Sequence, residues 1–127
     1  MEHGAGIMHA FWEIALKAFL FDEHNNPYWV KRWVPDPYDP YNYDKGHFEM
    51  LFVNKAYTRA YGKSQGDYEG KEDSVIWGEE IGKEFNESDR EALINGKSKE
   101  VFQGDEFRKY RRNYIDGTIL IIGRKMS

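Results

Sequence analysis

The chain has 127 residues, 40 % hydrophobic and 31 % charged, a composition typical of one globular domain with one core. Its formal net charge of -4 argues against nucleic acid as a partner, and the absence of cysteine excludes disulfides, thiolate metal sites and a cysteine nucleophile. The first residues do not have the pattern of a signal peptide, and no apolar run reaches the roughly 20 residues that span a bilayer. We therefore expect a cytoplasmic location and no membrane partner.

The first predicted element is a helix over Ile7–Phe21. Its polar residues His9, Glu13 and Lys17 recur at every fourth position, so they form one narrow stripe on an otherwise apolar surface. Such a helix needs burial over most of its surface, either against a partner or within its own domain. We expect residues 1–22 to form a flanking helix that pairs two copies into a homodimer. The residues expected at this dimer interface are Phe11, Trp12, Leu16, Phe19 and Leu20.

Two predicted strands and a long loop follow. Tyr28–Val34 is rich in aromatic and β-branched residues, and His47–Val53 alternates apolar with other residues, so both patterns predict strands. Between them, Pro35–Gly46 has three prolines and no periodicity, which predicts a loop of about 12 residues. Its aspartates do not have the spacing of a calcium-binding loop, so we expect them to serve as turn residues rather than metal ligands. They are Asp36, Asp39 and Asp44.

A short helix is predicted directly after the second strand. The side chain of Asn54 can accept a hydrogen bond from the backbone N–H of Ala56 or Tyr57, which is the role of an N-cap. The helix then runs over Lys55–Tyr61, and Gly62 provides a left-handed stop.

The middle of the chain predicts further helical structure. Lys63–Ile76 has the scattered polar residues and glycines of a loop with at most a short helical turn. Trp77–Phe85 predicts one helix. A second helix is predicted to begin at Ser88, because Ser88 and Glu91 fit a capping box, and to end at Gly96.

The last third of the chain predicts three strands. Lys99–Phe107 and Arg108–Ile115 are the first two, and Asp116-Gly117 is a strong hairpin signal before a third strand over Thr118–Ile122, whose apolar run indicates burial on both faces. Basic and aromatic residues interleave over Phe107–Tyr114. This pattern could bind single-stranded nucleic acid, but in an acidic chain we expect a solvated strand face. Strands paired by hairpins, with the helices grouped between them, indicate an α+β fold with an antiparallel sheet.

This order of elements, with its motifs, resembles the PAS domain family. The resemblance covers Tyr28–Met126 and implies a PAS domain over residues 23–127. It implies a five-stranded antiparallel sheet with short helices over one face, which enclose a pocket. The motif positions are Asn54, Ala56, Gly62, Ser64, Gly70, Lys71, Phe85, Asp89, Gly96 and Lys97.

The resemblance implies a sensory, signal-transduction domain that binds a small-molecule ligand or cofactor and signals through dimerisation to an effector protein or domain in trans. The alternative is a ligand-free protein–protein interaction module of the same fold. Each expected ligand-binding residue could instead simply fill the core, as aromatic residues at helical spacing usually do. The expected residues are Tyr57, Tyr61, Trp77, Ile81, Phe85, Leu93 and Ile121.

The sequence also limits the chemistry. It has no nucleophile motif, phosphate-binding loop or metalloprotease motif, so we do not expect an enzyme. A cysteinyl flavin adduct needs a cysteine, and haem held by a proximal histidine needs one on the helix over Asp89–Lys97, where none occurs. The identity of any cofactor stays open. We expect the four histidines to be surface or cap residues and no metal to be bound. They are His3, His9, His24 and His47.

Overall fold

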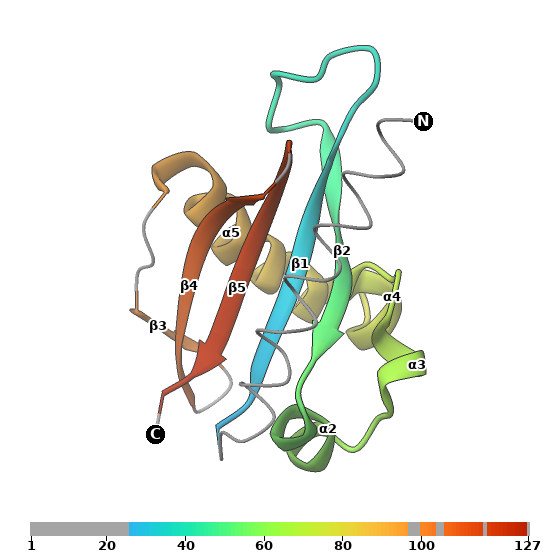
Figure 1. Cartoon of the computed structure of the whole chain (residues 1–127), viewed down its shortest axis with the longest axis vertical. Coiled ribbons are helices and arrows are strands. Elements are labelled where there is room, and N and C mark those ends of the chain that lie inside the picture. The colour runs from blue at the N-terminus through green and yellow to red at the C-terminus, as the bar shows by residue number, and fades with distance from the viewer. Residues whose placement is uncertain (1–25, 97–99, 104–105, 116, 127) are drawn as a thin grey trace.

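The computed structural model describes residues 26–96, 100–103, 106–115 and 117–126 (Figure 1). In these residues one antiparallel sheet is covered on one face by helices, so the α+β class expected from the sequence is confirmed. The predicted helix Ile7–Phe21 and its expected dimer-interface residues lie outside the described residues.

The sheet has five strands in the order β2-β1-β5-β4-β3. All of its neighbouring strands pair antiparallel. The strands and helices are β1 (Tyr28–Pro35), β2 (Gly46–Val53), α2 (Lys55–Tyr61), α3 (Gln65–Tyr68), α4 (Asp73–Trp77), α5 (Glu79–Asn95), β3 (Glu100–Gln103), β4 (Glu106–Ile115) and β5 (Thr118–Lys125).

The main core lies between the sheet and α5, which crosses behind the strands in Figure 1. Trp29 and Trp33 of β1 pack there with Leu93 of α5. Trp29 pairs in register with Gly123 of β5, and a Cβ atom at Gly123 would lie only 2.2 Å from the Trp29 ring. Glycine at this position therefore makes room for the indole. The core thus depends on a large residue and a missing side chain on adjacent strands.

The opposite face of the sheet has an apolar cluster of its own. Val30 and Leu120 are buried there, while Ile121, the next residue of β5, is fully buried in the main core. The prediction that this strand is buried on both faces is therefore confirmed.

Asn54 caps α2 as predicted, and its side chain also bonds to the backbone at the start of β1. Its side-chain oxygen accepts hydrogen bonds from the backbone N–H groups of Tyr57 and Tyr28, both at 3.0 Å. Its amide nitrogen donates to the carbonyl of Asn26 at 2.9 Å. One fully buried side chain therefore joins the end of β2, the start of α2 and the start of β1. Gly62 ends α2 in the left-handed conformation, also as predicted.

Three predictions for the middle of the chain are wrong. The single helix predicted over Trp77–Phe85 is interrupted at Gly78, where α4 ends and α5 begins. The predicted loop over residues 63–76 contains the two short helices α3 and α4. The predicted helix start at Ser88 does not exist, because α5 runs without a break from Glu79 to Asn95. Ser88 and Asp89 are both buried in the middle of α5, so tertiary packing outweighs the local capping signal.

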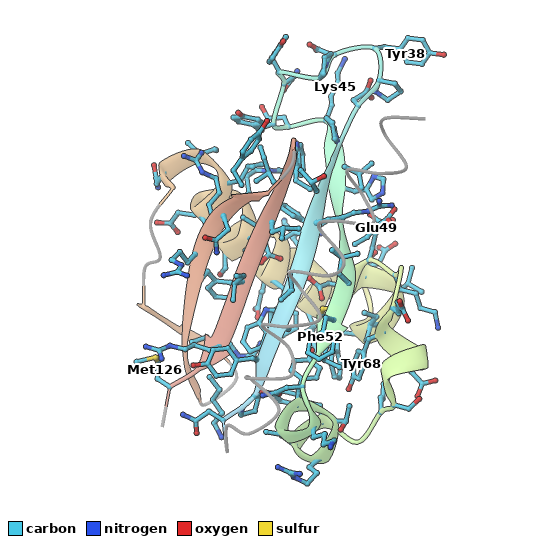
Figure 2. The ribbon with its side chains drawn as sticks, viewed as in Figure 1. Tyr38, Lys45, Glu49, Phe52, Tyr68 and Met126 are labelled. Carbon is cyan, nitrogen blue, oxygen red and sulfur yellow. The ribbon has the colours of Figure 1, made fainter. Side chains whose placement is uncertain are left out.

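The loop between β1 and β2 projects beyond the sheet, with Tyr38 pointing away from the domain (Figure 2). Asp36 accepts hydrogen bonds from the backbone N–H groups of Tyr38 at 2.8 Å and Asp39 at 3.2 Å. Asn42 donates to Asp39 at 3.1 Å. Asp36 and Asp39 therefore serve as turn residues here.

Replacing Asn54 with alanine should lower the free energy of unfolding by about 2–4 kcal/mol, because one cap is lost and buried backbone groups lose their partners. Asn54→Asp keeps the acceptor oxygen and should lose less. Urea unfolding followed by circular dichroism measures both, with the exposed neighbour substitution Lys55→Ala as control. A loss below about 1 kcal/mol for Asn54→Ala would contradict this role.

Candidate functional site

A pocket of about 210 Å³ lies where α2, the α4–α5 junction and β4 meet. It brings together five of the seven residues that the sequence analysis expected around a ligand. The other two, Leu93 and Ile121, are fully buried in the main core and do not line the pocket. The lining residues are Tyr57, Tyr61, Trp77, Ile81, Glu84, Phe85 and Arg108.

Aromatic rings in edge-to-face contact form most of the wall. The ring centroids of Tyr57 and Tyr61 lie 4.5 Å apart, those of Tyr61 and Trp77 6.0 Å, and those of Trp77 and Phe85 6.5 Å. Such pairs stabilise each other beyond their buried area. The chain of four rings therefore fixes the shape of the wall across α2, α4 and α5.

Arg108 of β4 is the buried cation of the pocket. Only 8 % of its surface is exposed, and its guanidinium carbon lies 4.7 Å from the Phe85 ring centroid, 5.3 Å from that of Trp29 and 5.5 Å from that of Tyr61. Its Nη2 donates to the Tyr61 hydroxyl at 3.3 Å. Stacking on aromatic faces suits the weakly hydrated, planar guanidinium.

The sequence analysis expected Phe107–Tyr114 to be a solvated strand face. That expectation is wrong for Arg108 and Tyr110, which are buried. Residues alternate between the two faces of a strand, so Arg108 and Tyr110 point to the helices while Arg111 is exposed.

A buried ionic cluster adjoins the pocket. The ammonium of Lys31 in β1 forms ion pairs with Asp73 of α4 and with Asp89 of α5, the latter at 2.6 Å. No member of this Lys31 cluster is more than 3 % exposed. Lys31 Nζ also lies 5.7 Å from the centroid of the Phe85 ring, which lines the pocket. Phe85 is therefore shared by the cluster and the pocket wall.

Burial and the attraction between opposite charges shift the pKa values of Lys31 and Asp89 in opposite directions. Burial lowers the pKa of the Lys31 ammonium, but the carboxylates of Asp73 and Asp89 raise it more, so it stays charged. Burial raises the pKa of Asp89 to about 7, and the neighbouring Asp73 carboxylate adds to this effect, against the pull of Lys31. Oδ1 of Asp89 is buried and has no hydrogen-bond partner among the described residues. Asp89 therefore titrates near neutral pH.

Tyr110 connects the cluster to Arg108. Burial raises its pKa to about 12, the negative charge of Asp89 contributes to the rise, and a hydrogen bond with Arg108 opposes it. Its phenol is therefore protonated at neutral pH.

The described residues contain no group of three or more His, Cys, Asp or Glu side chains that could hold a metal ion. The two carboxylates of the Lys31 cluster are bound by an ammonium instead. His47, on β2, lies 2.7 Å from Glu49, while the other three histidines fall outside the described residues. In the part of the chain that the structure describes, no helix is long and apolar enough to cross a bilayer.

Sequence reasoning missed Lys31, Asp73 and Arg108. The alternation of residues along a strand could have shown that Lys31 and Arg108 point inward. Lys31 stands midway between two inward tryptophans of its strand, and Arg108 shares its face with Tyr110. Asp73 had no such signal, because only the docking of α4 brings it to β1.

Alanine at Gly82 should disturb the α4–α5 junction. A Cβ atom there would lie 2.6 Å from the backbone of Ser74, so the two helices would have to move apart. We expect a loss of about 1–3 kcal/mol in unfolding free energy, although alanine normally stabilises a helix interior. Gly66→Ala, where a Cβ would meet nothing within 4 Å, is the matched control. Equal urea midpoints for the two variants would contradict the close approach.

The raised pKa of Asp89 predicts how stability depends on pH. Protonated Asp89 contributes to the free energy of unfolding. This contribution is fully present below the unfolded-state pKa of about 4 and is lost as the pH rises through the folded-state pKa of about 7. Between pH 5 and pH 8, the unfolding free energy of the unmutated protein should therefore fall by roughly 1–3 kcal/mol relative to that of Asp89→Asn. Glu87→Gln, on the exposed side of the same helix, should follow the unmutated protein. Parallel pH profiles for the Asp89→Asn variant and the unmutated protein would refute the assignment.

Comparison with known proteins adds no assignment for this site: no family model matches the chain, and no curated protein matches it. The site therefore rests on its own geometry. That geometry offers an aromatic pocket with one buried guanidinium, next to an ion cluster that can take up a proton near neutral pH.

Proposed function

We propose that this protein is a sensory domain of the PAS type that binds a small ligand in the pocket between α2, α5 and β4. The observation that carries the proposal is convergence: five residues expected on sequence grounds come from three helices and line one cavity. Aromatic walls with a few well-placed polar groups are typical of small-molecule sites.

The size of the pocket limits the ligand. Its volume of about 210 Å³ is below the roughly 300–1,000 Å³ of sites for drug-sized molecules. The ligand should therefore be a small molecule with one ring or a short branched chain rather than a flavin or haem. Ile81 supports access from solvent, because it lines the pocket and is 46 % exposed.

Signalling would proceed through a homodimer, formed by the apolar segment Ile7–Phe21, to an effector in trans. An occupied pocket would act on α5, which supplies three of the lining residues. A ligand-free interaction module is the alternative. It needs the same segment but no occupant in the pocket, so ligand binding separates the two proposals.

Ligand binding can be tested with a library of small aromatic fragments, using ligand-observed NMR and thermal shift on the full chain. We expect several fragments to bind and to raise the melting temperature. Ile81→Trp should weaken them at least about tenfold, because a larger side chain fills the entrance. Ile94→Trp, at a 55 % exposed position of the same helix away from the pocket, is the matched control.

Two results would refute the proposal. One is the absence of any binding fragment and of any co-purifying small molecule in native mass spectrometry. The other is equal weakening by Ile81→Trp and Ile94→Trp, since binding would then lie elsewhere.

A further inference from the structure

The outer face of the sheet, which is turned to the viewer in Figure 1 while α5 crosses behind the strands, has an apolar centre. Val30 of β1 is 3 % exposed and Leu120 of β5 is 1 % exposed. Three partly buried apolar residues pack around them, and these five residues form the outer cluster: Val30, Leu51, Phe52, Leu120 and Ile122. The outer cluster therefore extends over the three neighbouring strands β2, β1 and β5.

The described strands do not by themselves account for this burial. The main core combines residues of strands and helices, whereas the outer cluster, within the described residues, has residues of strands only. A side chain in the middle of a sheet face has neighbours beside it, but it has none above it unless a second layer covers the face. The nearly complete burial of Val30 and Leu120 therefore indicates a covering layer.

The chain that precedes β1 has the right length and starting point to form this layer. β1 begins at Tyr28 and lies between β2 and β5, so the chain enters the sheet within the strands of the outer cluster. As a helix, the 15 residues of Ile7–Phe21 would be about 22 Å long, close to the roughly 26 Å of the eight-residue strand β5. The six residues between Phe21 and Tyr28 can span about 20 Å, which exceeds the roughly 10 Å between packed layers.

The predicted helix has two apolar stripes, one on each side of its polar stripe. The first, which we call the Ile14 stripe, repeats at intervals of four, three and four residues and consists of Ile7, Phe11, Ile14 and Ala18. The second, the Leu16 stripe, consists of Trp12, Leu16 and Phe19. A sheet covers only one side of a helix, so it would bury one stripe and leave the other for a second copy.

Charge also favours contact between this segment and this face. Residues 1–25 contain four acidic residues and one lysine besides their histidines. Arg111 pairs in register with Ile122, and Arg124 lies two residues further along β5, so both arginines lie on the outer face beside the outer cluster. An acidic segment therefore complements this face electrostatically.

We propose that the segment Ile7–Phe21 packs on the outer face of the sheet of its own chain, with the Ile14 stripe against the outer cluster. The Leu16 stripe then remains available to a second copy, so docking on the sheet and dimerisation use different sides of one helix. This inference concerns the outer face and holds whether or not the pocket binds a ligand.

The absence of cysteine makes thiol labelling of the full chain a direct test. Val30→Cys places a single small, apolar thiol under the proposed helix, and Tyr114→Cys, at a 71 % exposed position of β4, gives the rate for an open thiol. We expect Val30→Cys to react with a maleimide at least about a hundredfold more slowly than Tyr114→Cys, since reaction requires the segment to detach.

Substitutions in the segment assign this protection to one side of the helix. Ile14→Asp should speed the labelling of Val30→Cys about tenfold or more, because a carboxylate cannot be buried against the outer cluster without a partner. His9→Asp, in the polar stripe, should leave the rate unchanged. Leu16→Asp should lower the mass of the dimer in sedimentation and also leave the rate unchanged, which separates docking from dimerisation.

A second measurement needs no disruptive substitution, so the proposal stays testable if Ile14→Asp does not fold. A nitroxide attached to Lys17→Cys, in the polar stripe, should broaden the NMR methyl signals of Val30 and Leu120 more than those of Leu93, which is buried on the other face. A mixture of nitroxide-labelled chains with isotope-labelled, nitroxide-free chains should not show this broadening.

Three results would overturn the proposal. Equal labelling of Val30→Cys with and without Ile14→Asp, in folded protein, would show that the segment does not cover the outer cluster. Broadening that occurs in the mixture would show that the segment of a second copy lies there. The absence of broadening in both samples would leave the face to a different partner.

Discussion

The ammonium of Lys31 holds the helical layer on the sheet. It binds carboxylates 42 and 58 residues further along the chain, one on α4 and one on α5. A buried ammonium without a partner would cost several kcal/mol, so α4 and α5 must dock where β1 places this group. Removing one partner from such a cluster typically costs about 3–5 kcal/mol. The cluster therefore specifies where the helices lie, whatever its net contribution to stability.

The same cluster sets the electrostatics of the pocket. Burial raises the pKa of Asp89 most, Lys31 lowers it, and the second buried carboxylate, Asp73, adds to the rise. Arg108 of β4 supplies a second positive charge on the side of the sheet that faces α5. The ring of Phe85 lies within reach of both cations, 5.7 Å from Lys31 Nζ and 4.7 Å from the Arg108 guanidinium carbon. The ion cluster and the pocket are thus parts of one buried arrangement rather than neighbouring sites.

Local signals in the sequence predicted the ends of elements well. Asn54, Gly62 and Gly96 act within one turn of the chain, so their caps can be predicted without tertiary structure. The same kind of signal failed at Ser88, where Ser88 and Asp89 are buried in the middle of α5 and the helix continues. The carboxylate of Asp89 can be buried because it binds Lys31, which lies 58 residues away in the sequence. No local sequence pattern contains that information. The inward direction of Arg108 is readable only from its alternation with Tyr110.

The split among the expected ligand residues has a physical reason. Ile81 and Phe85 lie in the first half of α5, opposite Arg108, whereas Leu93 lies in the second half and packs into the core with Ile121. A pocket remains beside the first half, between Ile81 and Phe85 of α5, the aromatic rings of α2 and α4, and Arg108 of β4. Core packing closes the second half completely. A ligand in the pocket would touch Phe85, the ring that also contacts Lys31, so its binding energy would act directly on the group that holds α4 and α5 to the sheet.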